Sequence, residues 1–230
     1  MITASPHAPT IPKSATNGWF TMADLLHQLG DVDASRVRME PRPGTATLED
    51  LIAANERRDG TVCEWVDSTL VEKKAMGFRE SSLAMILAYE FEHYLRSNDI
   101  GMIAGPVGVM KILPNIGRAP DVSFLRWDSL PGGRSPAHSD KVPAVVPDLA
   151  VEVLSASNRP KEVARKRSEY FRAGVHLVWE IDPETRSAIA YSSPTDSEVI
   201  PPDGMLDAGE VMPGFLLSLR AVFDRAERRG

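Results

Sequence analysis

The stretch PDLAVEVLSASNRPKEVARKRSEYFRAGVHLVWEIDP at residues 147–183 decides the fold. A nearly all-apolar run at 148–154 precedes a segment at 160–173 that is compatible with a helix, and a second apolar run follows at 176–182. Pro160 suits the first turn of a helix, and Gly174 suits the position just past its end. The order strand, helix, strand is a crossover unit, so the two strands should be parallel neighbours.

The rest of the chain supplies elements around this unit. The alternating runs TVCEWV and STLVEK predict a hairpin that turns at Asp67-Ser68, and residues 79–97 have a helical period. Further strands are predicted at 107–113, 121–125 and 186–191, and the tail from 211 onward, with its short helix, is expected to close the sheet edge. These elements place a mixed sheet between helices, so the predicted fold class is α/β (α+β).

The chain is expected to divide near residue 46. Residues 1–46 are predicted to form an N-terminal arm, because residues 1–18 carry prolines and small polar residues without a hydrophobic period. Within this arm, the run TMADLLHQLG at 21–30 predicts a short amphipathic helix. The main domain is predicted to span 47–230, including the C-terminal strand and helix.

Composition limits the classes of function. The 230 residues include 26 Lys+Arg and 32 Asp+Glu, a formal charge of −6, and 43% are hydrophobic, which excludes disorder as the dominant state. No apolar run approaches the ~20 residues of a membrane span, so a cytoplasmic location without a membrane partner is expected. The single Cys63 excludes an intramolecular disulfide. The acidic balance argues against coating nucleic acid by bulk positive charge.

Glu152 is the most unusual residue of the predicted central strand. Alternation places it on one face of the strand, with Val151 and Val153 on the other. A buried carboxylate without a partner would cost several kcal/mol or would raise its pKa. Two interpretations stay open: Glu152 is a metal ligand, or it lies at the open end of the strand and pairs with an arginine.

Two aspartates are candidates for a second carboxylate. Asp121 and Asp148 each follow a proline and each begin a predicted strand. Mg²⁺ prefers one or two carboxylates together with waters and substrate phosphate, so two acidic groups at adjacent strand ends would suffice. Taken singly, an aspartate at a strand start is more often a residue that caps a loop.

The helix predicted at 160–173 carries an inward-facing lysine. Lys166 shares a helix face with Val163 and Tyr170. It could stabilise charge at a phosphodiester, but on the residues alone a lysine whose stem packs and whose ammonium reaches water is preferred. The helix also carries an excess of cations that could follow a phosphate backbone or form a solvated face: Arg159, Lys161, Arg165, Lys166, Arg167 and Arg172.

Together these motifs resemble a known family. They are PDVSF at 120–124, PDLAVEVLSASN at 147–158, RKRSEYFRAGVHLVWEIDP at 165–183 and MPGF at 212–215. In order and spacing they are similar to the Uma family of putative restriction endonucleases, within the PD-(D/E)XK nuclease superfamily, and the likeness extends over about 47–223. The resemblance implies a restriction-endonuclease-like mixed central β-sheet flanked by helices, and 47–230 becomes a nuclease-like domain.

The resemblance also assigns site residues. Asp121 takes the place of the motif's aspartate and Glu152 that of its second acid, so these two residues are expected to bind Mg²⁺ or Mn²⁺ and to act in catalysis. The motif's lysine would stand at position 154, which is Leu154. In this family the lysine comes instead from the following helix, four residues before a tyrosine, which matches Lys166.

Glu64 and Glu80 match acidic positions in the N-terminal part of the family. They are expected to complete the metal shell or to orient water. A glutamate in the first turn of a helix, as at Glu80, is also favourable simply because of the helix dipole.

The resulting hypothesis is a metal-dependent endonuclease that hydrolyses DNA phosphodiester bonds, with DNA as its partner. The alternative is a catalytically silent module of the same fold that binds nucleic acid or serves assembly, for example as a homodimer. The charge of −6 and Leu154 at the motif's lysine position both favour this alternative. A third interpretation is a structural domain in which the acids only form ion pairs.

Overall fold

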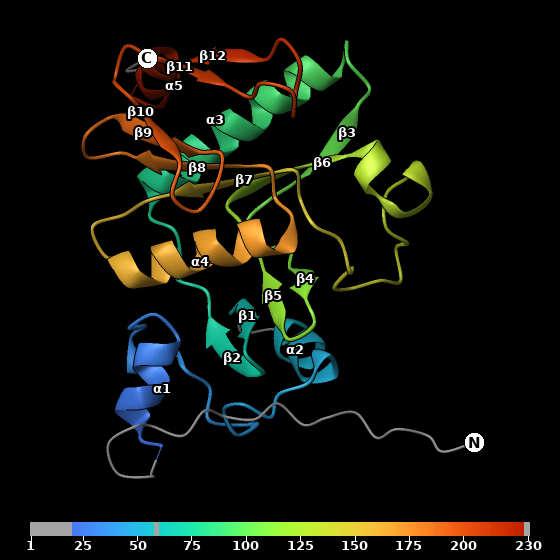
Figure 1. Cartoon of the computed structure of the whole chain (residues 1–230), viewed down its shortest axis with the longest axis vertical. Coiled ribbons are helices and arrows are strands. Elements are labelled where there is room, and N and C mark those ends of the chain that lie inside the picture. The colour runs from blue at the N-terminus through green and yellow to red at the C-terminus, as the bar shows by residue number, and fades with distance from the viewer. Residues whose placement is uncertain (1–19, 58–59, 228–230) are drawn as a thin grey trace.

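The computed structural model describes residues 20–57 and 60–227. Its central feature is a six-stranded mixed sheet with long helices on both faces, and a second, smaller sheet lies beside it (Figure 1). The part of the arm expected at 1–18 lies outside the described residues.

The helices have the following bounds: α1 Met22–Gln28, α2 Leu48–Asn55, α3 Phe78–Leu95, α4 Pro160–Ala173 and α5 Leu219–Ala226, with short 3₁₀ turns at Ala34–Arg36, Trp127–Ser129 and Pro131–Gly133. Both α1 and α2 begin with a capping box, in which Thr21 and Thr47 bond to the helix start. Helix α4 begins at Pro160 and ends at Ala173, and the next residue, Gly174, has a φ of 108° that only glycine adopts without strain. None of the described helices is long and apolar enough to cross a membrane.

The strands form three sheets. The main sheet has the order β10-β9-β8-β7-β6-β3, the smaller sheet has the order β2-β1-β5-β4, and β11 pairs with β12 alone. The strand bounds are β1 Cys63–Val66, β2 Thr69–Glu72, β3 Gly101–Ala104, β4 Met110–Leu113, β5 Ile116–Arg118, β6 Val122–Arg126, β7 Leu149–Val153, β8 Leu177–Asp182, β9 Ser187–Tyr191, β10 Ser197–Ile200, β11 Met205–Asp207 and β12 Leu216–Ser218.

The predicted crossover unit is confirmed. Strands β7 and β8 are parallel neighbours, with Glu152 opposite Glu180, and α4 connects them. The predicted hairpin is also confirmed, because β1 and β2 turn at Asp67 and Ser68, both with positive φ. The expectation that the tail closes the edge of the main sheet is wrong: β12 pairs with β11, and β10 forms that edge.

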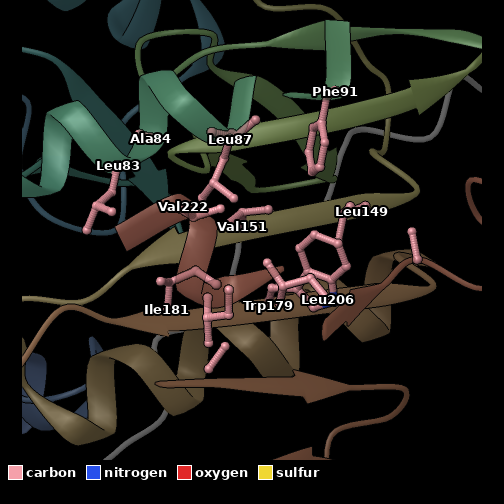
Figure 2. Close-up of a cluster of buried hydrophobic side chains, with 14 of the residues drawn as sticks. Leu83, Ala84, Leu87, Phe91, Leu149, Val151, Trp179, Ile181, Leu206 and Val222 are labelled. Atoms are coloured by element: carbon pink, nitrogen blue, oxygen red, sulfur yellow. The ribbon is translucent and has the colours of Figure 1, made fainter. Parts of the chain in front are cut away.

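The main core lies between the sheet and α3. Leu83, Leu87 and Phe91 of α3 pack on apolar side chains of β7 and β8, with Val222 of α5 beside them (Figure 2). The opposite face of the sheet packs against α4 in a second cluster, to which Ala150 and Tyr170 belong. The alternation predicted for 148–154 is therefore confirmed, and it turns Glu152 toward α4.

The described part of the predicted arm contacts the smaller sheet. Helix α1 is present where the sequence predicts it, and Leu25 and Leu29 pack in one cluster with Val66 and Val71 of the hairpin. The segment 20–46 thus covers the face of β1 and β2 and places Arg36 near the start of α4, where it binds Glu162 at 2.8 Å.

Candidate functional site

The antiparallel register of β6 and β7 brings two carboxylates together at one end of these two neighbouring strands. Val122 pairs with Val151, so Asp121, just before β6, lies beside Glu152, near the end of β7. The Asp121 N–H donates to the Val151 carbonyl at 2.9 Å, and the Val153 N–H donates to Asp121 Oδ2 at 2.9 Å. Asp121 is buried, and its position is fixed by main-chain bonds.

Glu152 points toward α4, where a tyrosine and a lysine meet it. The Tyr170 hydroxyl donates to Glu152 Oε1 at 2.5 Å, and Lys166 Nζ lies 3.5 Å from Oε2. Burial raises the pKa of the Glu152 carboxyl, an effect that the nearby Lys166 ammonium opposes. Burial and the negative charge of Glu152 raise the pKa of Tyr170, so the phenol stays protonated and its hydroxyl donates a hydrogen bond to Glu152.

Lys166 is held between two carboxylates. Its ammonium lies 3.4 Å from Glu64 Oε1 and 3.5 Å from Glu152 Oε2, and its side chain is 11% exposed. Burial disfavours its charge, but the carboxylates of Glu152 and Glu64 outweigh burial and raise the pKa of Lys166 above its ordinary value. The structure therefore favours a buried, charged lysine over one that reaches water.

Glu64 belongs to a buried ion-pair cluster. Arg118 Nη1 lies 2.7 Å from Glu64 Oε2, and Arg118 Nη2 lies 2.6 Å from Glu169 Oε2. The Ala119 N–H donates to Glu64 Oε1 at 3.2 Å. Burial raises the pKa of Glu64, but the charges of Lys166 and Arg118 outweigh it and lower this pKa to about 2. Both oxygens of Glu64 are thus engaged by the protein.

Sequence reasoning missed Lys73, which follows β2. Its ammonium lies 2.9 Å from Asp121 Oδ1 and donates to the carbonyls of Ala119 at 2.7 Å and Pro106 at 3.0 Å. The surrounding sequence VEKKA, at residues 71–75, is typical of a solvent-exposed strand end and does not predict this contact. Tyr170 was expected only as a marker of position, whereas the structure makes it the hydrogen-bond donor to Glu152.

Glu80 lines the same pocket as the two carboxylates. This pocket, with a cavity of about 50 Å³, is lined by Lys73, Glu80, Asp121, Glu152 and Lys166 among others. Glu80 lies in the first turn of α3, and its carboxylate folds back over Gly77. A Cβ atom at Gly77 would stand 2.3 Å from Glu80 Oε2, so the carboxylate can adopt this position only because residue 77 has no side chain.

Asp148 lies at the opposite end of β7 from Glu152. Its carboxylate accepts the Arg126 N–H at 2.7 Å and the Ser129 hydroxyl at 2.7 Å. These bonds hold the turn after β6, which is the role of a capping residue. The structure does not bring Asp148 to the pocket with Asp121.

Most cations of α4 are paired with carboxylates of the protein, partly in the interior and partly at the surface. Ion pairs join Lys161 to Asp31 at 2.6 Å, Arg165 to Asp67 at 2.8 Å and Arg167 to Glu180 at 2.5 Å, in addition to those of Lys166. Arg159 and Arg172 are exposed at the two ends of the helix. The helix therefore does not present the continuous basic surface that its sequence suggests.

The residues present fit a hard divalent cation, but they supply close to the smallest number of carboxylates that such an ion requires. Within the described ranges, no group of three or more His, Cys, Asp or Glu side chains is close enough to hold a metal ion. Mg²⁺ nevertheless needs only one or two protein carboxylates, because it keeps several waters. Asp121 and Glu152 supply two carboxylates in one pocket. The longest contact of these carboxylates described above is that of Glu152 Oε2 with Lys166 Nζ, at 3.5 Å.

Comparisons with known proteins place the chain in a family and match its fold. Among solved structures, the chain resembles a putative nuclease belonging to DUF820 from Anabaena variabilis ATCC 29413, with a TM-score of 0.63 and 17% identity over 72% of this chain and 91% of that one. No curated protein matches. The likeness to the solved structure confirms the nuclease-type mixed α/β fold. The family model Uma2, described as putative restriction endonuclease, matches residues 47–220, and the chain belongs to this family.

Proposed function

We propose that the protein is a metal-dependent endonuclease that hydrolyses phosphodiester bonds of DNA. One observation carries the proposal: Asp121 and Glu152, from adjacent strand ends, line one pocket together with the charged Lys166. Two carboxylates and a cation are the groups that phosphodiester hydrolysis needs to hold a divalent ion and to stabilise developing negative charge. Membership of the Uma2 family supports the same chemistry.

The proposed roles follow from the contacts. Asp121 and Glu152 would hold Mg²⁺ or Mn²⁺, which when bound supplies a Lewis acid and an activated water. Tyr170 fixes the orientation of Glu152 through its hydroxyl. Lys166 remains protonated and can donate to a phosphate oxygen, because its ammonium faces the pocket rather than bulk water. DNA would reach the site at the mouth of this pocket.

The two remaining glutamates take different proposed roles. Glu64 is fully buried, does not line the pocket and is paired with the buried Arg118, so we assign it to positioning Lys166 rather than to the metal. No donor among the described residues engages the Glu80 carboxylate, which lines the pocket, so Glu80 is the residue best placed to orient a water or a water ligand of the metal.

Purified protein incubated with supercoiled plasmid tests the proposal. With Mg²⁺ or Mn²⁺ we expect nicked and linear products, and with EDTA we expect none, because the carboxylates alone supply no activated water. Cleavage that is unchanged in EDTA would remove the metal from the mechanism. Absence of cleavage with both metals, while the chain still binds the plasmid, would favour the silent nucleic-acid module.

Replacing Gly77 with alanine should lower plasmid cleavage about tenfold and the melting temperature by only a few degrees, since Gly77 is the N-cap of α3 and alanine is a poorer N-cap. The backbone of Gly77 has an ordinary φ of −68°, and the added methyl group meets only the movable end of Glu80. The substitution therefore displaces the Glu80 carboxylate from its place. Gly105→Ala, where a Cβ meets nothing within 4 Å, is the matched control. Equal activity of both variants would show that the placement of Glu80 is irrelevant.

The alternative of an assembly module has its own supporting observation. Phe78, Met85 and Tyr89 form an exposed apolar stripe along α3, with 93%, 65% and 47% of their surfaces exposed. Such a stripe is typical of a surface that contacts another protein chain. A concentration-dependent dimer in light scattering, combined with no cleavage, would favour this alternative.

A further inference from the structure

The Lys73 ammonium lies in a cradle of three oxygen atoms. Asp121 Oδ1 is 2.9 Å away, and the carbonyl oxygens of Ala119 and Pro106 are 2.7 and 3.0 Å away. The side chain of Lys73 is 9% exposed. An ammonium has three N–H donors, so the three oxygens satisfy it fully.

One carboxylate and two main-chain carbonyls are also the ligands that hard divalent cations choose. In sites that use two metals, the ions stand about 3.5–4 Å apart around the reacting phosphate. Lys73 is paired with Oδ1 of Asp121, and the N–H of Val153, the residue after Glu152, donates to Oδ2. The lysine charge thus stands where a second metal would need to bind Asp121.

We propose that Lys73 is a built-in cation that replaces a second metal, so that the centre binds one divalent ion per chain. This inference rests on the proposed function, because that function places the first ion between Asp121 and Glu152. Lys73 then supplies the second positive charge at the same carboxylate, without any need for metal uptake.

The charges around the pocket agree with a single ion. Asp121 and Glu152 are already balanced by Lys73 and Lys166, so each added divalent ion brings two unbalanced positive charges. Of the other two carboxylates that line the pocket, Glu162 is bound by Arg36 at 2.8 Å, which leaves Glu80 as the one without an ion-pair partner among the described residues. Glu64 is neutralised by Arg118. A second divalent ion would therefore meet a repulsion that the single carboxylate of Glu80 offsets only in part.

Titration of the full-length protein with Mn²⁺ tests the stoichiometry directly. Free Mn²⁺ is counted by electron paramagnetic resonance, and calorimetry gives the number of sites independently of DNA cleavage. We expect one Mn²⁺ per wild-type chain and a second, weaker site in Lys73→Met, in which the oxygen cradle loses its ammonium. Lys74→Met is the matched control and should bind one ion, because Lys74 is exposed and its ammonium donates to the Ser157 carbonyl rather than to Asp121.

The outcomes separate this inference from the proposed function. Two ions in the wild-type protein, or one ion in a folded Lys73→Met variant, would overturn the role given to Lys73. If Lys73→Met does not fold, Lys73→Gln replaces it with the same expectation. One ion in the wild-type protein and two in the variant, without plasmid cleavage, would support the inference while overturning the nuclease proposal. No ion in the wild-type protein would overturn both.

Discussion

Glu152→Gln is expected to cleave plasmid DNA roughly a thousandfold more slowly than the wild-type protein, a loss of about 4 kcal/mol of transition-state stabilisation. The amide cannot carry the negative charge that a divalent ion needs. It nearly preserves the shape of the side chain, and it can still accept the bond from the Tyr170 hydroxyl, so the fold should remain intact. Initial rates of plasmid nicking, with circular dichroism as a check of folding, measure the effect.

The neighbouring strand offers a closely matched control. Glu180 lies opposite Glu152 in the register of β7 and β8, is also buried, and is also paired with a cation of α4, Arg167. Burial raises the pKa of Glu180, as it does for Glu152. Glu180 does not line the pocket of Asp121. Glu180→Gln should therefore retain activity within about threefold of wild type, and an equal loss in both variants would refute the assignment of Glu152.

Arg118→Leu is expected to lower the free energy of unfolding by about 3–5 kcal/mol. Arg118 is 2% exposed and is bound by both Glu64 and Glu169, which are equally buried. Removal of the arginine leaves two carboxylates of the same sign without their main partner in the interior. Such uncompensated burial costs far more than the loss of an ion pair at the surface.

Urea unfolding followed by tryptophan fluorescence measures this change, and a fall of the melting temperature on the order of 10 °C should accompany it. Arg220→Leu is the control, because its contact with Asp203 is 3.8 Å long and both side chains are more than half exposed. It should change stability by less than about 1 kcal/mol. The triple variant Arg118→Leu, Glu64→Gln, Glu169→Gln should recover part of the loss. No recovery would place the cost in packing rather than in charge.

The sequence predicts the parts of the site that depend on local periodicity. Alternation along 148–154 places Glu152 on the face toward α4, and helical spacing places Lys166 and Tyr170 on the face toward Glu152. The antiparallel pairing that brings Asp121 beside Glu152 was not visible in either strand alone. The family resemblance supplied that link, and the register of β6 and β7 agrees with it.

The contacts that sequence reasoning missed are long-range. Lys73 meets carbonyl oxygens at positions 106 and 119, and no periodic pattern encodes a lysine bound to distant main-chain groups. The ion pairs of α4 are not predictable from its sequence for the same reason, because the partners Asp31 and Asp67 come from other elements. Short strands such as β5 and β12, with three residues each, are too brief for alternation to be recognised.

The residues of the candidate site are spread over the chain from Glu64 on β1 to Lys166 on α4, and they come from both large sheets. Arg118, near the middle of this span, needs Glu64 before it and Glu169 after it. A nascent chain that has not yet released α4 from the ribosome lacks Lys166 and Tyr170 and leaves Arg118 with one partner. Synthesis itself therefore delays the assembly of the centre, and on the proposed function the chain cannot cleave DNA until α4 has left the ribosome.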